Sequence, residues 1–423
     1  MSDVTSAAPR IVTLDIVRGV AVMGILAMNI VAFAMPFQAY MNPTAYGLEG
    51  DADLASWLFS FIFIDGKMRG LFSFLFGAST LLVIERAERS GASPARVHYA
   101  RMFWLLVFGL IHFYFIWFGD ILSGYALIGL VLYFFRNLGV RALVIWGIAL
   151  VAVQFLLFGS LAAGAVFLSQ QAAAPNADPA IVAQWRGLQQ QFAPLQGAAL
   201  AGKIGLFQGP YSGLVHQRLI EQGTDPFTSA FLFGWETLAY MLFGMAALKS
   251  GLFRGEWAPE RYRKVALVGF AVAVPVYALF AYLLIRDGFS IPMVLAISLA
   301  ATTPFRPVMV IGYVALIILA TRSGGALVRR IAAAGRAAFT NYLGTSILMT
   351  TFFYGYGLGF YGAMSRVELW IVVLAMWALM LLWSKPWLER FQYGPLEWLW
   401  RSLSRLRPQP MRRPAAPAAA LSE

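Results

Sequence analysis

The sequence predicts an all-α polytopic membrane protein with about ten transmembrane helices. Of its 423 residues, 60% are hydrophobic and only 12% are charged, and the mean hydropathy is +0.69. A soluble chain with so few charged residues could not cover its apolar surface. Apolar runs recur along the chain with the length of about 20 residues that a helix needs to cross a bilayer. A transmembrane barrel is excluded, because its strands would alternate apolar and polar residues.

The apolar runs give the order of the elements. The predicted spans are 14–36, 68–84, 102–118, 121–135, 142–168, 227–248, 265–285, 305–321, 337–357 and 367–384. Two shorter apolar segments, 53–66 and 289–303, fit re-entrant or interfacial pieces. The stretch 169–226 is polar and amphipathic, so we expect it to cover one face of the protein. A single transmembrane domain, 1–390, includes this insert.

Basic residues predict an orientation in which both termini face the cytoplasm. The segments that then lie inside hold 23 of the 32 lysines and arginines, as the positive-inside rule requires. They are 1–10, 85–101, 136–141, 249–264, 322–336 and 385–423. The tail 391–423 is basic and then rich in proline and alanine, so it should contact anionic lipid and then become disordered. The net charge of +12 therefore indicates a membrane orientation, and no nucleic-acid partner is expected.

Two absences narrow the chemistry. The chain has no cysteine, which excludes disulfides and cysteine-ligated metals. The N-terminus has no small-residue cleavage site after a short apolar core, so we expect the first helix to be an uncleaved span. No tightly bound cofactor and no metal site is predicted.

The first span carries three polar residues on one stripe. In LDIVRGVAVMGILAMNI, Asp15, Arg18 and Asn29 are separated by 3 and 11 residues, which at about 100° per residue places them on one side of the helix. Charged residues inside spans are costly and predict function. The alternative is an ion pair of Asp15 and Arg18 at the interface, with Asn29 in an interhelical hydrogen bond.

Charge also gathers between segment 53–66 and the second span. In FIDGKMRGLFSFLFG, Asp65, Lys67 and Arg69 lie beside two glycines. Two cations in such a turn can hold a phosphate or carboxylate group. The alternative is an interfacial turn whose basic side chains reach the headgroups.

The third span contains a histidine and an aspartate in the apolar run GLIHFYFIWFGDIL. His112 and Asp120 are eight residues apart, about 80° around a continuous helix but two turns apart. They can meet only if the helix breaks, and Gly119 permits a sharp turn there. A histidine in a span can serve as a general base, or it can donate one interhelical hydrogen bond. His98 and His216 are expected at the surface.

The ninth span has a polar first half, within GRAAFTNYLGTSILMTTFF. Asn341 and Thr345 share a face, and Tyr342 lies between them. These residues can line a binding site, or they can bind neighbouring helices through amide and hydroxyl groups.

Five blocks, RIVTLDIVRGVAVMGILAMNI, DGKMRGLFSFLFG, GLIHFYFIWFGDILSGYAL, GRAAFTNYLGTSIL and YGPLEWLWRSL, resemble the bacterial YeiB-like membrane proteins, which carry the domain of unknown function 418. The resemblance runs almost from end to end and implies a multi-pass protein of the bacterial inner membrane.

The first block also resembles the entry to the transmembrane acyltransferases. These include the acyltransferase-3 enzymes and the lysosomal enzyme that acetylates terminal glucosamine of heparan sulfate. The resemblance implies transfer of an acyl group from cytoplasmic acyl-CoA to a glycan, lipid or small-molecule acceptor. Acyltransferase-3 proteins have a histidine where this chain has Asn29, and residues 30–97 contain none. His112 then becomes the candidate base by elimination.

The leading hypothesis is therefore a transmembrane acyltransferase. The catalytic residues would be His112 as base, Asp120 to orient it or the acceptor, and Asn29 as oxyanion donor. The residues that would bind substrate are Asp15, Arg18, Lys67, Arg69, Arg101, Asn341 and Tyr342.

Three alternatives stay open at this point. The buried charges could serve a proton-coupled transporter or a lipid-handling protein, or the chain could be an envelope scaffold. A homo-oligomer is also open. An enzyme, unlike a solute transporter, needs a basic pocket of the size of CoA at the cytoplasmic ends of the first and third spans.

Overall fold

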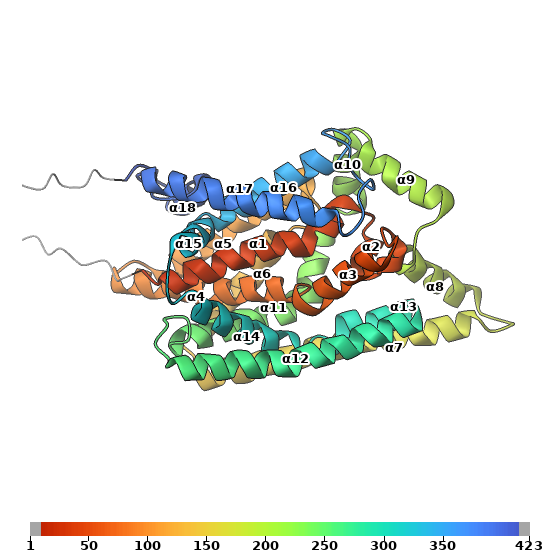
Figure 1. Cartoon of the computed structure of the whole chain (residues 1–423), viewed down its shortest axis with the longest axis horizontal. Helices are drawn as coiled ribbons and strands as arrows, with labels where there is room; N and C mark the ends of the chain where they lie inside the picture. The colour runs from red at the N-terminus through yellow and green to blue at the C-terminus, as the bar shows by residue number, and fades with distance from the viewer. Residues whose placement is uncertain (1–9, 414–423) are drawn as a thin grey trace, which may run out of the picture.

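The structure is a computed structural model that describes residues 10–413, and this range folds into α-helices without a β-sheet (Figure 1). A helix in every predicted span satisfies its own backbone hydrogen bonds, as a chain in a bilayer must. These helices are α1 (Val12–Ala34), α4 (Lys67–Arg89), α5 (Pro94–Ile111) with a π turn η2 (His112–Ile116), α6 (Leu122–Leu132) with η3 (Tyr133–Phe135), α7 (Val140–Ala172), α11 (Asp225–Lys249), α12 (Pro259–Asp287), α14 (Arg306–Ala320), α16 (Ala338–Phe353) and α17 (Leu369–Arg390).

The lengths of these helices establish a multi-pass membrane protein. Within the described range, seven helices are long and apolar enough to cross a membrane, and a bent pair gives an eighth. The segment Leu122–Phe135 is apolar but shorter, and α16 has 16 residues. The count of ten spans therefore stays a prediction.

The two short apolar segments differ from each other. Segment 53–66 forms α3 (Asp51–Phe63), which continues through Gly66 into α4, so that Asp51–Arg89 is one span-length unit. By length and composition it joins α4, and its placement as a re-entrant or interfacial piece stays a prediction. Segment 289–303 forms α13 (Ile291–Val294) and a π turn η5 (Leu295–Ala301), bent by 52° from α14. This geometry fits a re-entrant loop or a broken span.

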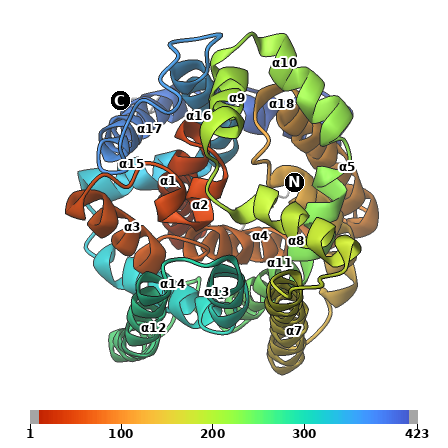
Figure 2. The same cartoon turned by 90° about the vertical axis from the view of Figure 1, so that its right-hand side faces the viewer.

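Helix α1 lies at the centre of the bundle and packs against α4, α16, α17 and α15 (Ala326–Arg336) (Figure 2). Glycine permits the closest crossings. A Cβ atom on Gly335 would lie 1.8 Å from the carbonyl oxygen of Asp15, and one on Gly77 would lie 2.0 Å from that of Met241. The helix pairs α1/α15 and α4/α11 therefore approach closely at glycines, and Gly19 and Gly244 make similar crossings in the same two pairs, as small-residue packing in membranes predicts.

The polar insert covers one end of the molecule, as expected. It contains α8 (Pro179–Phe192), α9 (Gly197–Gln208), α10 (Tyr211–His216) and a π turn η4 (Gln217–Glu221), which lie at the right of Figure 1 and face the viewer in Figure 2. A smaller connection follows α1, formed by α2 (Gln38–Met41) and η1 (Pro43–Ala45).

Both ends of the described range lie at the opposite end of the molecule (Figure 1). Arg10 and Arg413 are both close enough to Arg336 to repel its charge. This agrees with termini on one side of a membrane; the assignment of that side to the cytoplasm stays a prediction.

The first part of the predicted tail belongs to the fold. Helix α18 (Pro395–Ser404) packs against α5 and α16. The chain then turns back, and Gln392 N donates to Met411 O at 2.9 Å. The predicted disordered stretch, rich in proline and alanine, lies in 414–423, outside the described residues.

Candidate functional site

A break in α5 brings His112 and Asp120 together. The helix ends at Ile111, the π turn follows, and Trp117 has extended backbone angles (φ −154°, ψ 133°). His112 Nδ1 then lies 2.8 Å from Asp120 Oδ1, with both side chains fully buried. The sequence predicts that His112 and Asp120 can meet only if the helix breaks, and the helix does break here. π turns within helices occur frequently at functional sites.

Asp120 is saturated as a hydrogen-bond acceptor. Its Oδ1 also accepts from Leu122 N at 3.1 Å, and its Oδ2 accepts from Ser123 N at 2.7 Å and Ser123 Oγ at 2.6 Å. An ionised carboxylate only accepts hydrogen bonds, so this arrangement places the imidazole proton on Nδ1. The lone pair of His112 is then on Nε2.

His112 Nε2 is buried and has no hydrogen-bond partner among the described residues. Its ring lies between two aromatic side chains, with ring centroids 5.2 Å from Tyr342 and 6.3 Å from Trp117. A buried acceptor without a partner loses free energy of about 1–3 kcal/mol. Such a group is therefore the one that a substrate proton or a water molecule would satisfy.

A small cavity of about 10 Å³ lies beside this pair. Asn29 lines it together with Trp117, Tyr342 and Thr345. The Thr345 hydroxyl and the Trp117 indole nitrogen are buried without partners within the described range. The volume is about that of one water molecule, so this space, which shares Trp117 and Tyr342 with the surroundings of His112, holds no large group.

A much larger cavity, of about 990 Å³, opens at the end of the molecule that carries Arg10. Eight arginines line it: Arg10, Arg18, Arg86, Arg89, Arg101, Arg254, Arg336 and Arg401. Four carboxylates line it as well: Asp15, Glu85, Glu256 and Glu397. The cavity wall therefore carries an excess of positive charge and attracts anions.

The predicted cations of the first and third spans are both in this wall. Arg18 pairs with Asp15 at 3.4 Å and donates to Ser79 Oγ at 2.6 Å. The Arg101 guanidinium stacks over the ring of Trp400, 4.1 Å from its centroid. Since neither arginine is fully engaged by carboxylates of the described chain, their remaining donors can bind a further anion.

Arg336 shows the crowding of positive charge at the mouth. Burial, with the nearby guanidinium groups of Arg10 and Arg413, lowers the pKa of Arg336 to about 10. An anion bound there would relieve this repulsion. Arg336 was predicted to end the inside segment 322–336, next to the ninth span, and was not predicted as a site residue.

Apolar side chains and Tyr342 also line the large cavity. The apolar residues include Phe72, Leu75, Leu105 and Leu122. Tyr342 lines the small cavity as well, and its hydroxyl accepts from Ile121 N at 3.3 Å. Tyr342 is therefore shared by the walls of both cavities, and its ring also packs on His112.

Two of the predicted binding residues, Lys67 and Arg69, lie outside the large cavity. Lys67 is fully buried beneath α3, over the ring of Tyr277 at 3.4 Å from its centroid. Arg69 pairs with Glu236, so a carboxylate of the chain itself occupies the predicted anion site. Neither side chain lines the large cavity.

Asn341 is engaged between helices. Its Nδ2 donates to Ala334 O at 3.0 Å and to Ser384 Oγ at 3.2 Å, while its Oδ1 accepts from Trp383 Nε1 at 2.9 Å. This is the alternative that the sequence left open, an amide that binds neighbouring helices.

Sequence analysis missed the buried cluster around Glu236. Its Oε1 accepts from Arg306 NH1 at 2.9 Å and from Tyr240 OH at 2.7 Å, and its Oε2 accepts from Arg69. Glu236 lies mid-span in α11 and Arg306 opens α14, so an intramembrane charge was the available signal. His98 is also a correction: it is buried and bonds Gly129 O at 2.8 Å instead of facing solvent. His216 is exposed as expected.

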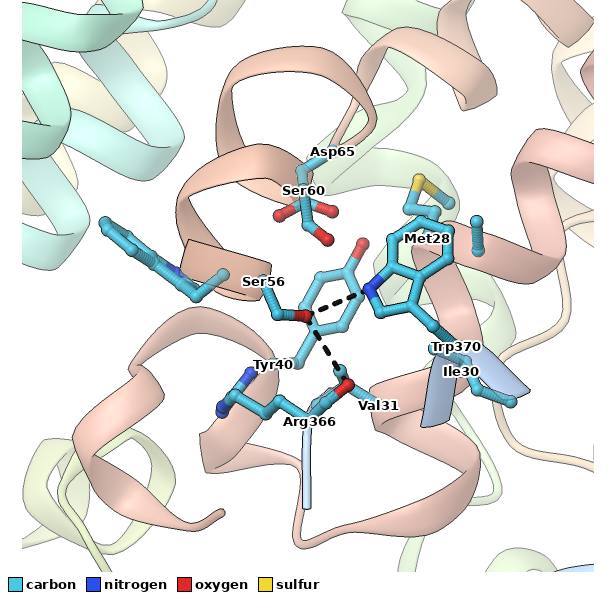
Figure 3. Close-up of a pocket in the computed structure, with 11 residues that line it drawn as sticks. Met28, Ile30, Val31, Tyr40, Ser56, Ser60, Asp65, Arg366 and Trp370 are labelled. Carbon is cyan, nitrogen blue, oxygen red and sulfur yellow. Dashed lines mark hydrogen bonds between the residues drawn. The ribbon is translucent and has the colours of Figure 1, made fainter. Parts of the chain in front are cut away.

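A third cavity, of about 20 Å³, lies near the N-terminal end of α4, beside Asp65. The side chains of Tyr40, Ser60 and Asp65 face one another there (Figure 3). Ser56 Oγ accepts from Trp370 Nε1 at 2.9 Å in its wall. The space holds about one water molecule, so it cannot admit a substrate.

The fold and cavities define a class: a multi-pass helical membrane protein with a basic internal cavity beside a buried His–Asp pair. Comparisons with known proteins give the family. The chain is 32% identical over 408 residues to the uncharacterized protein YeiB of Escherichia coli (strain K12), covering 93% of this chain and 96% of that protein. It is 31% identical over 415 residues to the uncharacterized protein YxaH of Bacillus subtilis (strain 168), covering 95% and 96%.

A family model described as "Protein of unknown function (DUF418)" matches residues 247–407. The chain therefore belongs to the YeiB-like DUF418 family, and the resemblance noted in the sequence is confirmed. No solved structure matches the chain.

Proposed function

We propose that the protein is an integral membrane acyltransferase that moves an acyl group from cytoplasmic acyl-CoA to a hydroxyl or amine acceptor. One observation carries the proposal: Tyr342 lines the basic cavity, and the ring of Tyr342 packs on His112. One side chain thus contacts both a candidate site for an anionic donor and a buried candidate base.

Acyl-CoA suits the large cavity chemically. Its phosphates match the arginines of the cavity wall, because guanidinium groups bind phosphate oxygens through paired hydrogen bonds. The less polar pantetheine arm matches the apolar side chains that line the same cavity with Tyr342. The thioester would then lie near His112. In this proposal acyl-CoA is a substrate, and the protein needs no tightly bound cofactor.

His112 would act as a general base through Nε2. It would take the proton of the acceptor hydroxyl or amine as the acceptor oxygen or nitrogen forms a bond to the thioester carbon. Asn29 would donate to the developing oxyanion. The carbon–sulfur bond then breaks, and the CoA thiolate takes the proton from the imidazolium. Asp120, saturated with hydrogen bonds, holds the imidazole in the tautomer that this requires.

The proposal places the protein in the cytoplasmic membrane of a bacterium, with membrane lipids around it. Its acceptor would be a glycan, a lipid or a small molecule. A homo-oligomer is compatible with it.

Release of free CoA thiol from acetyl-CoA and longer acyl-CoAs tests the proposal, with a membrane extract as the source of acceptor. Because the chain contains no cysteine, a thiol-reactive dye does not label the protein itself; the thiols of the extract are blocked beforehand, so that the signal reports released CoA. We expect Arg18→Ala to lower the release at limiting acyl-CoA by about tenfold, the loss of one charge-assisted hydrogen bond. Arg329→Ala, which removes an exposed arginine outside the cavity, should have no effect. If folded wild-type protein and folded Arg329→Ala both release no thiol, the result would count against the proposal.

A second function, proton-coupled transport, is favoured by one observation. Asp65 lines the third cavity, the one shown in Figure 3, and belongs to a span-length helical unit. Carboxylates inside a membrane often carry protons. Under this alternative, transport would depend on Asp65 and would not require acyl-CoA.

A further inference from the structure

Buried polar atoms without partners gather in one part of the molecule. Seven such side-chain atoms occur in the described range. Five of them belong to one group: His112 Nε2, Thr345 Oγ1, Trp117 Nε1, Tyr354 OH and Arg218 NH2. Each is costly to bury unsatisfied, so their grouping indicates a place where a ligand or water supplies the missing partners.

These side chains form a continuous row. Trp117 lies beside His112 and lines the small cavity with Thr345. The phenol of Tyr354 lies close enough to the indole of Trp117 to accept a hydrogen bond from it, and lies within electrostatic range of Arg218. The row therefore runs from the His112 site to η4, which is part of the polar insert and contacts η2. From His112, this row of side chains leads towards the polar insert and away from the basic cavity.

Arg218 ends the row as a buried cation without a counter-charge. It is 3% exposed; its Nε donates to Leu214 O at 3.1 Å and its NH1 to Phe113 O at 3.5 Å. No carboxylate of the described chain pairs with it, and its NH2 is unpartnered. Burying an uncompensated charge costs several kcal/mol, and such a cost is removed when an anion binds.

The surroundings of Arg218 suit an oxyanion. The phenol groups of Tyr354, Tyr211 and Tyr356 all interact electrostatically with its guanidinium. Phenol hydroxyls and guanidinium nitrogens are donors to carboxylate and phosphate oxygens. Tyr211 OH already donates to Phe115 O at 2.6 Å, whereas Tyr354 OH and Arg218 NH2 are buried and have no acceptor within the described range.

We propose that Arg218 and Tyr354 form a second binding site, at the insert end of the row, for an oxyanion group (a phosphate or carboxylate) of the acceptor. As an acceptor site, this inference rests on the proposed function; as an anion site, it stands alone. The donor would enter from the basic cavity and the acceptor from the opposite end, so that the two meet at His112.

The test is a thermal-shift titration of the purified protein with inorganic phosphate at constant ionic strength. We expect phosphate to raise the melting temperature of the wild type. Arg218→Gln should weaken this apparent affinity by at least about tenfold, and Tyr354→Phe should weaken it by about fivefold. Arg186→Gln, which changes an exposed arginine of the same insert, should respond like the wild type.

A second arm identifies the source of the anion. The protein is placed in nanodiscs of phosphatidylcholine alone or with phosphatidylglycerol. Stabilisation by phosphatidylglycerol that Arg218→Gln abolishes would assign the site to a lipid headgroup, whereas a response to free phosphate alone would assign it to a soluble anion. No response to either probe, or equal responses in the wild type, Arg218→Gln and Tyr354→Phe, would overturn the inference.

Acyl-CoA binding separates this inference from the proposed function. Arg218→Gln should leave acyl-CoA affinity unchanged, because Arg218 does not line the basic cavity. If the wild type binds phosphate through Arg218 but binds no acyl-CoA, the anion site stands and the acyltransferase proposal fails. If Arg218→Gln does not fold, Tyr354→Phe, which removes only a hydroxyl, decides the question.

Discussion

Two buried ionic groups in this protein each contain a carboxylate whose acceptor positions are filled, but only one of the two groups leaves a polar atom without a partner. Around Glu236, the carboxylate accepts from Arg306, Tyr240 and Arg69, and none of these polar atoms lacks a partner. Around Asp120 the carboxylate is equally saturated, but the histidine it holds keeps a free Nε2. A saturated cluster can only hold helices together. An unsaturated one has a lone pair left for chemistry.

The surroundings sharpen this contrast. The Glu236 cluster joins α4, α11 and α14 and lines neither the large cavity nor the small one beside His112. The His112 pair adjoins both, through Tyr342. Charge inside a membrane is therefore not enough to locate a site; the unsatisfied atom and the access are what distinguish it.

The largest effect should come from breaking the saturated cluster. Glu236→Ala leaves Arg69 and Arg306 buried without their carboxylate, which costs about 3–5 kcal/mol. We expect most of the protein to be lost as aggregate on size-exclusion chromatography in detergent. A monodisperse variant with the melting temperature of the wild type would show that the cluster does not support the fold.

The next effect should fall on activity alone. His112→Asn keeps an N–H that can donate to Asp120 but removes the second ring nitrogen. We expect acyl transfer to fall by about 10²–10⁴-fold, the usual contribution of a general base, while acyl-CoA binding and melting temperature stay close to those of the wild type. Thiol release at an unchanged rate would remove His112 from the mechanism.

Two buried asparagines, Asn29 and Asn341, extend the comparison. Asn341→Ala removes three interhelical hydrogen bonds and should lower the free energy of unfolding by about 1–3 kcal/mol, with little change in acyl transfer. Asn29→Ala, at the small cavity, should lower acyl transfer by about 10²-fold with a smaller loss of stability. Melting curves and thiol release on both variants measure this; the reverse pattern would exchange their roles.

The smallest effect concerns Glu397, which caps α16. It accepts from Phe339 N at 2.6 Å and from Thr340 N at 3.1 Å, and burial raises the pKa of Glu397 above its ordinary value of 4.5. A raised carboxyl pKa adds stability at low pH, and this is lost as pH rises through the folded-state pKa. Glu397→Gln should flatten the melting temperature between pH 4.5 and neutrality. An unchanged pH profile would contradict the raised pKa.

Much of the fold was readable from the sequence, because apolar length and basic loops follow directly from the bilayer. The helices fall in the predicted spans, and the insert 169–226 covers one end. The link between α3 and α4 was not predicted. A glycine such as Gly66 indicates an interruption between two helices, but here it joins two segments of one span-length unit.

The site was predictable only in part. His112, Asp120 and Arg18, which lie at the candidate site, were predicted because charge in an apolar run stands out, and Arg101 was predicted from its place at the cytoplasmic end of the third span. Lys67, Arg69 and Asn341 stood out equally, yet their partners come from distant helices, such as Glu236 from α11 and Ser384 from α17. Which polar residue is already satisfied depends on tertiary contacts, and no local pattern contains them.

The most direct measurement is a calorimetric titration of acetyl-CoA and longer acyl-CoAs into the purified wild type, Arg18→Ala and Arg329→Ala. The account predicts saturable binding by the wild type and Arg329→Ala, and binding about tenfold weaker by Arg18→Ala. Folded wild-type protein that binds no acyl-CoA would contradict it, and the buried charges would then have to be explained as a transport path.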